Sequence, residues 1–338
     1  MMRMIPLAFA LLLPIPAVAG DMAGISRDAV EQHIMPRYAV LDDTSQALAK
    51  AASQTCDVAA PALTDAYDAA FDAWIAASHL RFGPSEAGDR AFALAFWPDT
   101  RGITPRTLRT LIADADPVAA SAEAYADVSI AARGFYALEM MLYDAEIQAL
   151  GTPEYRCALM QVMAADIANL ASAIRADWQG GYAEKLAQPG ADGPYRGEAE
   201  ASQELFKALT YGLEFTSDTR LGRPLGTFDQ PRPKRAEAWQ SGRSLRNVAL
   251  SLASLGDLAA ILAQGDPGLQ TRLQDAFSTA LAEAKTLDDP VFAGVAMPAS
   301  RIRVEALQQS IDSVRDIVRD DLGPSLGVAS GFNAMDGD

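Results

Sequence analysis

Tyr136 and Glu139 are the two side chains whose types and spacing most clearly suit metal binding. They lie three positions apart, so a helix would place both on one face. Phe135, Leu138 and Leu142 form an apolar stripe beside them, which predicts that Glu139 lies at the edge of a helical bundle interior. A carboxylate in such a place is costly unless it is paired or binds a metal ion. Bundle metal sites are built from inward-facing carboxylates of this kind, so Tyr136 and Glu139 are candidate metal ligands.

Both candidates also have an ordinary structural interpretation. Glu139 would be satisfied by a buried ion pair with an arginine such as Arg133 or Arg101. Tyr136 is also typical of an amphipathic aromatic residue at the edge of a core. The residues alone leave these alternatives open.

The chain has two histidines, His33 and His79, and both are further candidate metal ligands. His33 lies in the predicted first helix of the mature chain, where a hydrogen-bonded interior histidine is the alternative. His79 closes a helix whose Phe71, Trp74 and Ile75 face inward, and there a capping role is the alternative.

The standard catalytic motifs are absent from the sequence. It contains no Gly-x-Ser-x-Gly nucleophile elbow, no phosphate-binding glycine loop and no dinucleotide fingerprint. The His-Glu-x-x-His pair of a conventional zinc protease is also missing. We therefore expect a protein that is not an enzyme, and we predict no catalytic residue.

The elements that position these side chains are predicted to be helices. Apolar residues recur at intervals of three and four, and the period-two alternation of strands is absent. The clearest stripes are Val304, Leu307, Ile311, Val314 and Val318, and Leu245, Val248, Leu252, Leu255 and Leu262. Asp266-Pro267 predicts an N-cap followed by proline at the first helical position. The pattern predicts an all-α protein built from helical bundles.

The predicted organisation has three parts. Residues 1–19 are a signal peptide, residues 20–180 a first helical bundle that carries Tyr136 and Glu139, and residues 197–338 a second helical bundle. The division rests on a cluster of glycine and proline residues between 180 and 197.

A second segment rich in glycine and proline, Ser217–Pro233, is predicted to be a surface loop of the second bundle. Asp99-Thr100-Arg101-Gly102 resembles Asp218-Thr219-Arg220-Leu221-Gly222, which favours duplication of a four-helix bundle.

The first nineteen residues have the pattern of an export signal. Arg3 precedes the apolar stretch Ile5–Leu13, and Ala17-Val18-Ala19 offers the small-x-small pattern that signal peptidase recognises. No cysteine lies near the cleavage point, so we expect no lipid anchor. No later segment has an uninterrupted apolar run of about 18 residues, so we expect no membrane span. The mature protein is predicted to be periplasmic.

The formal net charge is −16. Such an acidic chain repels phosphates, which disfavours nucleic acid and anionic membranes as partners. Arg232–Arg235 and Arg243–Arg246 form the only basic patch. This patch is either a solvated surface or a contact for an anion or a carboxylate.

Cys56 and Cys157 are the only cysteines. In an oxidising compartment an even pair predicts a disulfide, which here would close a loop of about 100 residues. Two unrelated buried thiols are the alternative.

Several stretches resemble the imelysin family. That family carries a Gly-x-His-x-x-Glu motif, and this chain reads Gly134-Phe135-Tyr136-Ala137-Leu138-Glu139, with tyrosine in place of the histidine. Other similar stretches are His33-Ile34-Met35-Pro36-Arg37-Tyr38, His79-Leu80-Arg81-Phe82-Gly83-Pro84, Phe96-Trp97-Pro98-Asp99, Arg223-Pro224-Leu225-Gly226, Lys234-Arg235-Ala236-Glu237, Ser241-Gly242-Arg243-Ser244-Leu245-Arg246-Asn247 and Gly331-Phe332-Asn333. Together these stretches cover nearly all of the mature chain.

The resemblance implies a two-bundle all-α fold, a role in iron uptake and a metal site that includes Glu139. Iron, or an iron-containing ligand, is then the expected cargo, with membrane-bound uptake components as partners. A phenolate is a good ligand for the hard ferric ion, so Tyr136 indicates either a shift towards ferric iron or loss of the site. The alternative functions are an interaction module with a decayed metal site and, as the family's peptidase label suggests, a hydrolase.

Overall fold

The computed structural model describes residues 22–328, and within this range every regular element is helical. The described residues contain no strand; a single isolated bridge joins Thr227 and Gln230. The all-α prediction is therefore confirmed. The predicted signal peptide, residues 1–19, lies outside the described residues.

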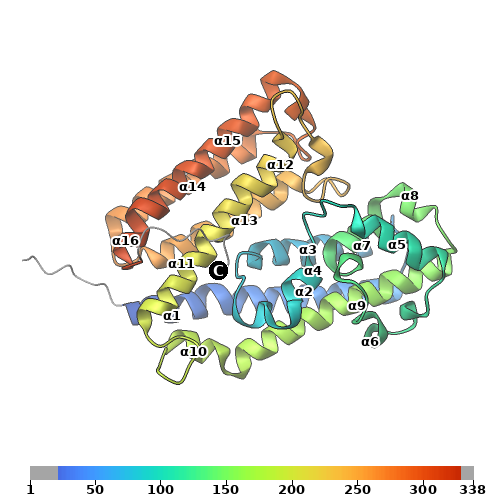
Figure 1. The fold of residues 1–338 in the computed structure, drawn as a ribbon, viewed down its shortest axis with the longest axis horizontal. Coiled ribbons are helices and arrows are strands. Elements are labelled where there is room, and N and C mark those ends of the chain that lie inside the picture. The colour runs from blue at the N-terminus through green and yellow to red at the C-terminus, as the bar shows by residue number, and fades with distance from the viewer. Residues whose placement is uncertain (1–21, 329–338) are drawn as a thin grey trace, which may run out of the picture.

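Four helices form the first set, which carries the motif residues. They are α2 (Met35–Gln54), α3 (Pro61–Ala77), α7 (Gly134–Tyr143) and α9 (Pro153–Asp177). Helices α2, α3 and α9 run side by side, and α7 packs against α9 (Figure 1). Helices α3 and α9 each begin with a proline, which lacks the N–H that would have no partner there.

Short helical elements connect α3 to α9. They are 3₁₀ turns at Gly83–Ser85, Ala87–Asp89, Pro117–Ala120 and Ile130–Ala132, and the helices α4 (Arg90–Leu94), α5 (Ile103–Ala113), α6 (Ala122–Tyr125) and α8 (Ala145–Gln148). They position the motif helix α7 because α4 and α5 both contact it.

Four further long helices form the second set. They are α11 (Glu198–Glu214), α13 (Ser244–Leu262), α14 (Pro267–Thr286) and α15 (Pro298–Ile317). The predicted stripe from Val304 to Val318, which lies on α15 and the first residue of the π-helix that follows it (Val318–Leu322), is buried. Asp266 caps α14 as predicted, since its carboxylate accepts hydrogen bonds from the N–H groups of Gly268 and Leu269, both at 3.0 Å.

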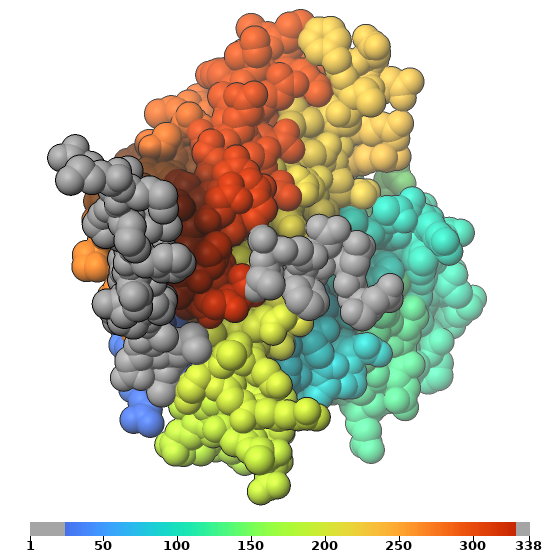
Figure 2. Space-filling view, turned by 60° about the vertical axis from the view of Figure 1, so that its left-hand side comes forward, coloured from blue at the N-terminus to red at the C-terminus, as the bar shows by residue number. Residues whose placement is uncertain are grey.

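The two sets pack directly against each other. Helix α3 contacts α13, and the N-terminal helix α1 (Met22–Asp28) packs on α11. Arg37 binds Asp257 at 2.7 Å, and Arg243 binds Asp68 at 2.8 Å, so ion pairs join the sets at two places. In Figure 2 the orange and red C-terminal residues and the gold residues beside them form the upper part of the surface, and the yellow-green segment that includes α10 (Ala183–Ala187) lies below them. The predicted bundle boundaries, residues 20–180 and 197–338, stay a prediction.

The segment Ser217–Pro233 is not the surface loop that the sequence predicted. Helix α11 continues into a π-helix, Phe215–Leu221, and then into α12 (Gly222–Leu225). Ser217 and Arg220 are buried in it. Apart from Asp218, the exposed residues of the segment lie in the turn after α12, because helical hydrogen bonding continues through Gly222, where the glycine and proline content predicts a loop.

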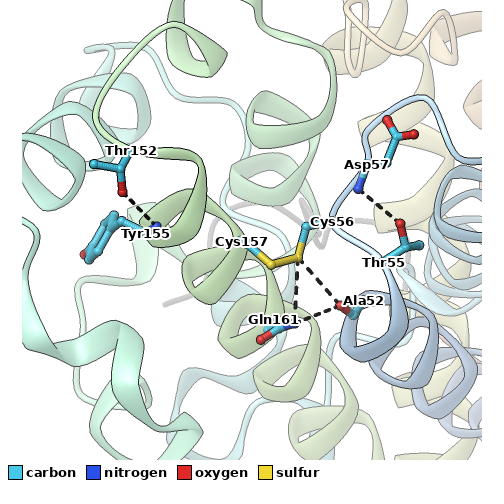
Figure 3. Close-up of a disulfide and its surroundings, with 8 residues drawn as sticks. All are labelled: Ala52, Thr55, Cys56, Asp57, Thr152, Tyr155, Cys157 and Gln161. Atoms are coloured by element: carbon cyan, nitrogen blue, oxygen red, sulfur yellow. Dashed lines mark hydrogen bonds between the residues drawn. A yellow bond between two sulfur atoms is a disulfide. The ribbon is translucent and has the colours of Figure 1, made fainter.

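Cys56 and Cys157 form the predicted disulfide, with their Cα atoms 5.3 Å apart. The bond joins the residue just beyond α2 to the first turns of α9 (Figure 3). Gln161 lies one turn further along α9 and donates to the carbonyl of Ala52 at 3.2 Å. The disulfide therefore fixes two long helices of the first set at one end.

Two helical stretches, 153–187 and 244–262, are long and apolar enough to cross a membrane by length and composition alone. In the fold, 56% and 50% of their most apolar windows are buried against other helices. Core helices of folded domains pass the same test, so the absence of a membrane span stays a prediction.

Candidate functional site

Gly134 begins the motif helix α7 in a conformation that favours glycine. Its φ is +74°, in the left-handed region, and an added Cβ would lie 2.1 Å from the carbonyl oxygen of Leu94 and 2.3 Å from that of Ala93. The motif glycine therefore lets the start of α7 approach the backbone of α4 closely.

We expect the Gly134→Ala substitution to lower the free energy of unfolding by about 2–5 kcal/mol. The left-handed conformation costs a non-glycine residue ~1–2 kcal/mol and the backbone clash adds ~1–3 kcal/mol. Urea unfolding followed by circular dichroism measures the change. Gly88→Ala is the control for the conformational cost alone, because Gly88 has φ +61° and no atom within 4 Å of its added Cβ. Equal losses in the two variants would contradict the close-approach explanation.

Tyr136 lies two residues further along α7, and its hydroxyl donates to Oε1 of Glu237 at 2.5 Å. Burial and the neighbouring Glu237 carboxylate raise the pKa of Tyr136 well above its usual value. The phenol is therefore protonated at neutral pH, and Glu237 is the base in contact with its proton.

Glu237 is a functional candidate that the sequence did not single out. It lies 101 residues from Tyr136 along the chain and is 1% exposed. Its Oε2 accepts from Nε of Arg220 at 2.7 Å and from Nδ2 of Asn247 at 3.0 Å. Tyr136 belongs to the first set of helices, and its hydrogen bond thus connects that set to a buried ion pair of the second set. The only signal for Glu237 in the sequence is its place in the stretch Lys234–Glu237, which resembles the imelysin family.

Glu139 forms neither of the ion pairs considered for it. Its Oε1 accepts from the backbone N–H of Ser241 at 2.9 Å and from the Ser241 hydroxyl at 2.7 Å. Arg133 instead binds Asp166 at 2.6 Å, and Arg101 is exposed. Burial raises the pKa of Glu139 to about 7, since the hydrogen bonds from Ser241 only partly offset the loss of solvent. Near neutral pH this carboxyl group is therefore close to half protonated.

The two histidines contact each other. Nε2 of His33 lies 2.8 Å from Nε2 of His79, and both rings are buried. Burial lowers the pKa of both rings, that of His79 to about 3, so both are neutral and one donates to the other. A distance of 2.8 Å is that of a hydrogen bond. Two nitrogens that bind one metal ion at ~2.0–2.1 Å in tetrahedral geometry lie further apart.

Two hollows adjoin the motif helix. A small cavity of about 30 Å³ is lined by Tyr136, His79, Arg220 and Glu237, so Tyr136 and one histidine share it. A larger, open cleft of about 400 Å³ is also lined by Tyr136. The cleft residues are Tyr136, Glu139, Met140, Asp144, Phe96, Trp97, Asp99, Thr100, Gly102, Thr104, Pro105, Arg223, Lys234, Arg235, Ala236, Ala238, Trp239 and Gln240.

The structure thus divides the four candidate ligands. Tyr136 and Glu139 line the cleft together, and His33 and His79 pair with each other behind it. Within residues 22–328 no group of three or more His, Cys, Asp or Glu side chains is arranged to hold a metal ion. Metal binding by these four residues stays a prediction. A metal ion in the cleft would have to be held by the Tyr136 phenolate or to enter with a ligand already bound to it.

The fold is that of imelysin-like proteins. An imelysin-like protein from Psychrobacter arcticum 273-4 superposes with a TM-score of 0.75 at 20% sequence identity, over 96% of this chain and 100% of that one. A protein from Parabacteroides distasonis ATCC 8503, described as a "putative iron-regulated protein A precursor", gives a TM-score of 0.73 at 14% identity, over 89% of this chain and 95% of that one. At these identities the two likenesses concern the fold alone.

Sequence comparison gives the family. No curated protein matches the chain. The family model for imelysin, which carries the label peptidase M75, matches residues 34–318 and so spans most of the chain, including the motif helix and Glu237. The chain belongs to the imelysin family.

Proposed function

We propose that this protein is exported to the periplasm, binds iron in the cleft beside α7 and passes it to membrane-bound uptake components. The observation that carries the proposal is the meeting of Tyr136 and Glu139 in one cleft, with Glu237 directly behind the phenol. Tyr136 and Glu139 both offer oxygen atoms to the cleft, which suit a hard ion such as ferric iron better than the softer divalent ions that prefer imidazole.

The hydrogen bond from Tyr136 to Glu237 supplies a route for the proton that iron binding must displace. A phenol binds ferric iron as phenolate, so its proton has to leave. Glu237 lies 2.5 Å from the phenol oxygen and is the first acceptor of that proton, which it then passes on because its ion pair with Arg220 stabilises the charged carboxylate. Glu139 carries the second displaceable proton, because burial holds its pKa at about 7. Iron binding is therefore expected to strengthen as the pH rises through 7.

Two further observations support a link to iron. The family resemblance implies a role in iron uptake, and one protein of similar fold is described as iron-regulated. The export pattern of residues 1–19 would place the protein in the compartment through which iron passes.

The arrangement of the described side chains suits a binding protein better than a peptidase. His33 and His79 share their hydrogen bond with each other, and neither Nδ1 atom has a partner. A serine or cysteine peptidase needs its histidine in contact with the nucleophile, and a metallopeptidase needs a set of protein ligands. We therefore propose that the family's peptidase label does not describe this chain's activity.

The test is equilibrium binding of ferric and ferrous iron to the metal-stripped protein. We expect ferric iron to bind and the Glu139→Ala substitution to weaken it at least tenfold, roughly the effect of losing one charged ligand interaction. Glu154→Ala is the matched control, since Glu154 is exposed in the first turn of α9. Absence of binding by the wild type, or equal binding by Glu139→Ala and wild type, would refute the proposal.

A further inference from the structure

Three cationic side chains of the cleft have no anionic partner. Arg223, Lys234 and Arg235 line it, and none of them forms an ion pair with another described residue. The Nε atom of Arg223 is buried and has no hydrogen-bond partner. Burial and the like charge of Arg235 lower the pKa of Arg223, which places the two guanidinium groups in mutual repulsion. A buried donor without a partner and two repelling cations both favour binding of an anion at this place.

The acidic residues of the cleft do not supply that anion, because each already accepts hydrogen bonds. Asp99 accepts from two backbone N–H groups around the start of α5, at 3.2 and 2.8 Å. Asp144 caps α8 and accepts from the side chain of Gln240 at 2.7 Å. Glu139 accepts from Ser241. None of the three carboxylates forms an ion pair with Arg223, Lys234 or Arg235, so these cations have no direct anionic partner among the described residues.

The other half of the basic patch, Arg243–Arg246, differs because its arginines have anionic partners. Arg243 and Arg246 both bind Asp72, and Arg243 also binds Asp68, so these two arginines hold the helix sets together. Unlike Arg223 and Arg235, these two arginines therefore have their charge neutralised by carboxylates.

Aromatic rings hold two of the cations at the walls of the cleft. The guanidinium of Arg223 lies over the ring of Trp97, and the ammonium of Lys234 lies over the ring of Trp239, each 5.7 Å from the centroid. A ring under a cation fixes the cation without neutralising its charge. The cleft volume of about 400 Å³ greatly exceeds that of a single ion and falls within the ~300–1,000 Å³ typical of small-molecule sites.

We propose that Arg223, Lys234 and Arg235 form a binding site for a small organic polyanion of the polycarboxylate class, and that iron enters the cleft as a complex with it. The iron part of this inference rests on the proposed function, whereas the anion site does not. Some carboxylates of such a ligand bind the cations at the cleft walls, and others hold the iron ion. This arrangement explains how a cleft with few protein ligands takes up a metal ion.

The test is calorimetric titration of the metal-free protein with iron-free citrate, at low and at physiological ionic strength. We expect saturable binding that weakens as salt is added, because the cations are partly exposed to solvent. Arg223→Gln and the double substitution Lys234→Gln with Arg235→Gln should each weaken binding about tenfold or more, as loss of charged hydrogen bonds does. Lys234 and Arg235 are exposed, so the double variant retains the fold.

Arg303→Gln is the matched control, since it removes the same charge from an exposed position on α15. No citrate binding at millimolar concentration, equal affinity in the cleft variants and the control, or binding of inorganic phosphate as tight as that of citrate would overturn the polycarboxylate site. Citrate binding that the cleft variants weaken, in a protein that binds neither iron nor ferric citrate, would support the anion site and refute only the proposed iron function. Iron binding without any citrate binding would refute only the anion site.

Discussion

The Glu237→Ala substitution is expected to lower the free energy of unfolding by about 3–5 kcal/mol, the usual effect of removing one partner from a buried ion pair. Arg220 is 3% exposed and has Glu237 as its only carboxylate partner among the described residues. Its other hydrogen bonds go to the neutral hydroxyl groups of Ser78, Thr216 and Ser251, at 3.1–3.4 Å. Without Glu237 the guanidinium charge stays buried and unpaired, and the Tyr136 hydroxyl loses its acceptor.

The control for this prediction is Glu146→Ala. Glu146 binds Arg109 at 2.6 Å, but the two side chains are 77% and 46% exposed. Exposed pairs of this kind contribute ~0–1 kcal/mol. Urea unfolding of both variants compares the two positions directly. If Glu237→Ala lost no more stability than Glu146→Ala, the buried ion pair between Glu237 and Arg220 would not stabilise the fold as described.

Reduction of the Cys56–Cys157 disulfide is the second large effect. The two cysteines lie 101 positions apart, and the chain-entropy model gives roughly 4–5 kcal/mol for a loop of about this length. We expect the protein to unfold at a lower urea concentration in reducing buffer. The loss of stability arises mainly because the unfolded chain gains conformational entropy when the disulfide is broken.

The double variant Cys56→Ser with Cys157→Ser separates this effect from other actions of the reductant. It should have the stability of the reduced wild type, and its stability should not change on addition of reductant. A wild-type protein that unfolds at the same urea concentration with and without reductant would contradict the prediction.

The helices were largely predictable because burial imposes a period of three to four on the sequence. The stripe from Val304 to Val318 is an example, since its members face the core in the structure. The segment Ser217–Pro233 was not predictable in the same way. Its glycine and proline residues indicate a loop, whereas the fold stabilises a π-helix and α12 through Arg220 and other buried contacts.

Only half of the site could be inferred from the sequence. Tyr136 and Glu139 lie on one helix face, so local spacing is enough to bring them together. Their partners Glu237 and Ser241 lie about 100 positions away, and a single sequence does not show which distant turn packs on α7. The same limit applies to the histidines, because the sequence shows two possible ligands but not that their Nε2 atoms share a hydrogen bond.

The most direct test of iron binding at the motif helix is a ferric titration of the metal-stripped protein, followed by visible absorption, with and without citrate. We predict saturable binding with a tyrosinate-to-iron absorption band that is lost in Tyr136→Phe. The band should persist in Tyr143→Phe, a half-buried tyrosine two turns along the same helix. Absence of ferric binding by the wild type, or a band unchanged in Tyr136→Phe, would contradict the proposal that Tyr136 and Glu139 form an iron site.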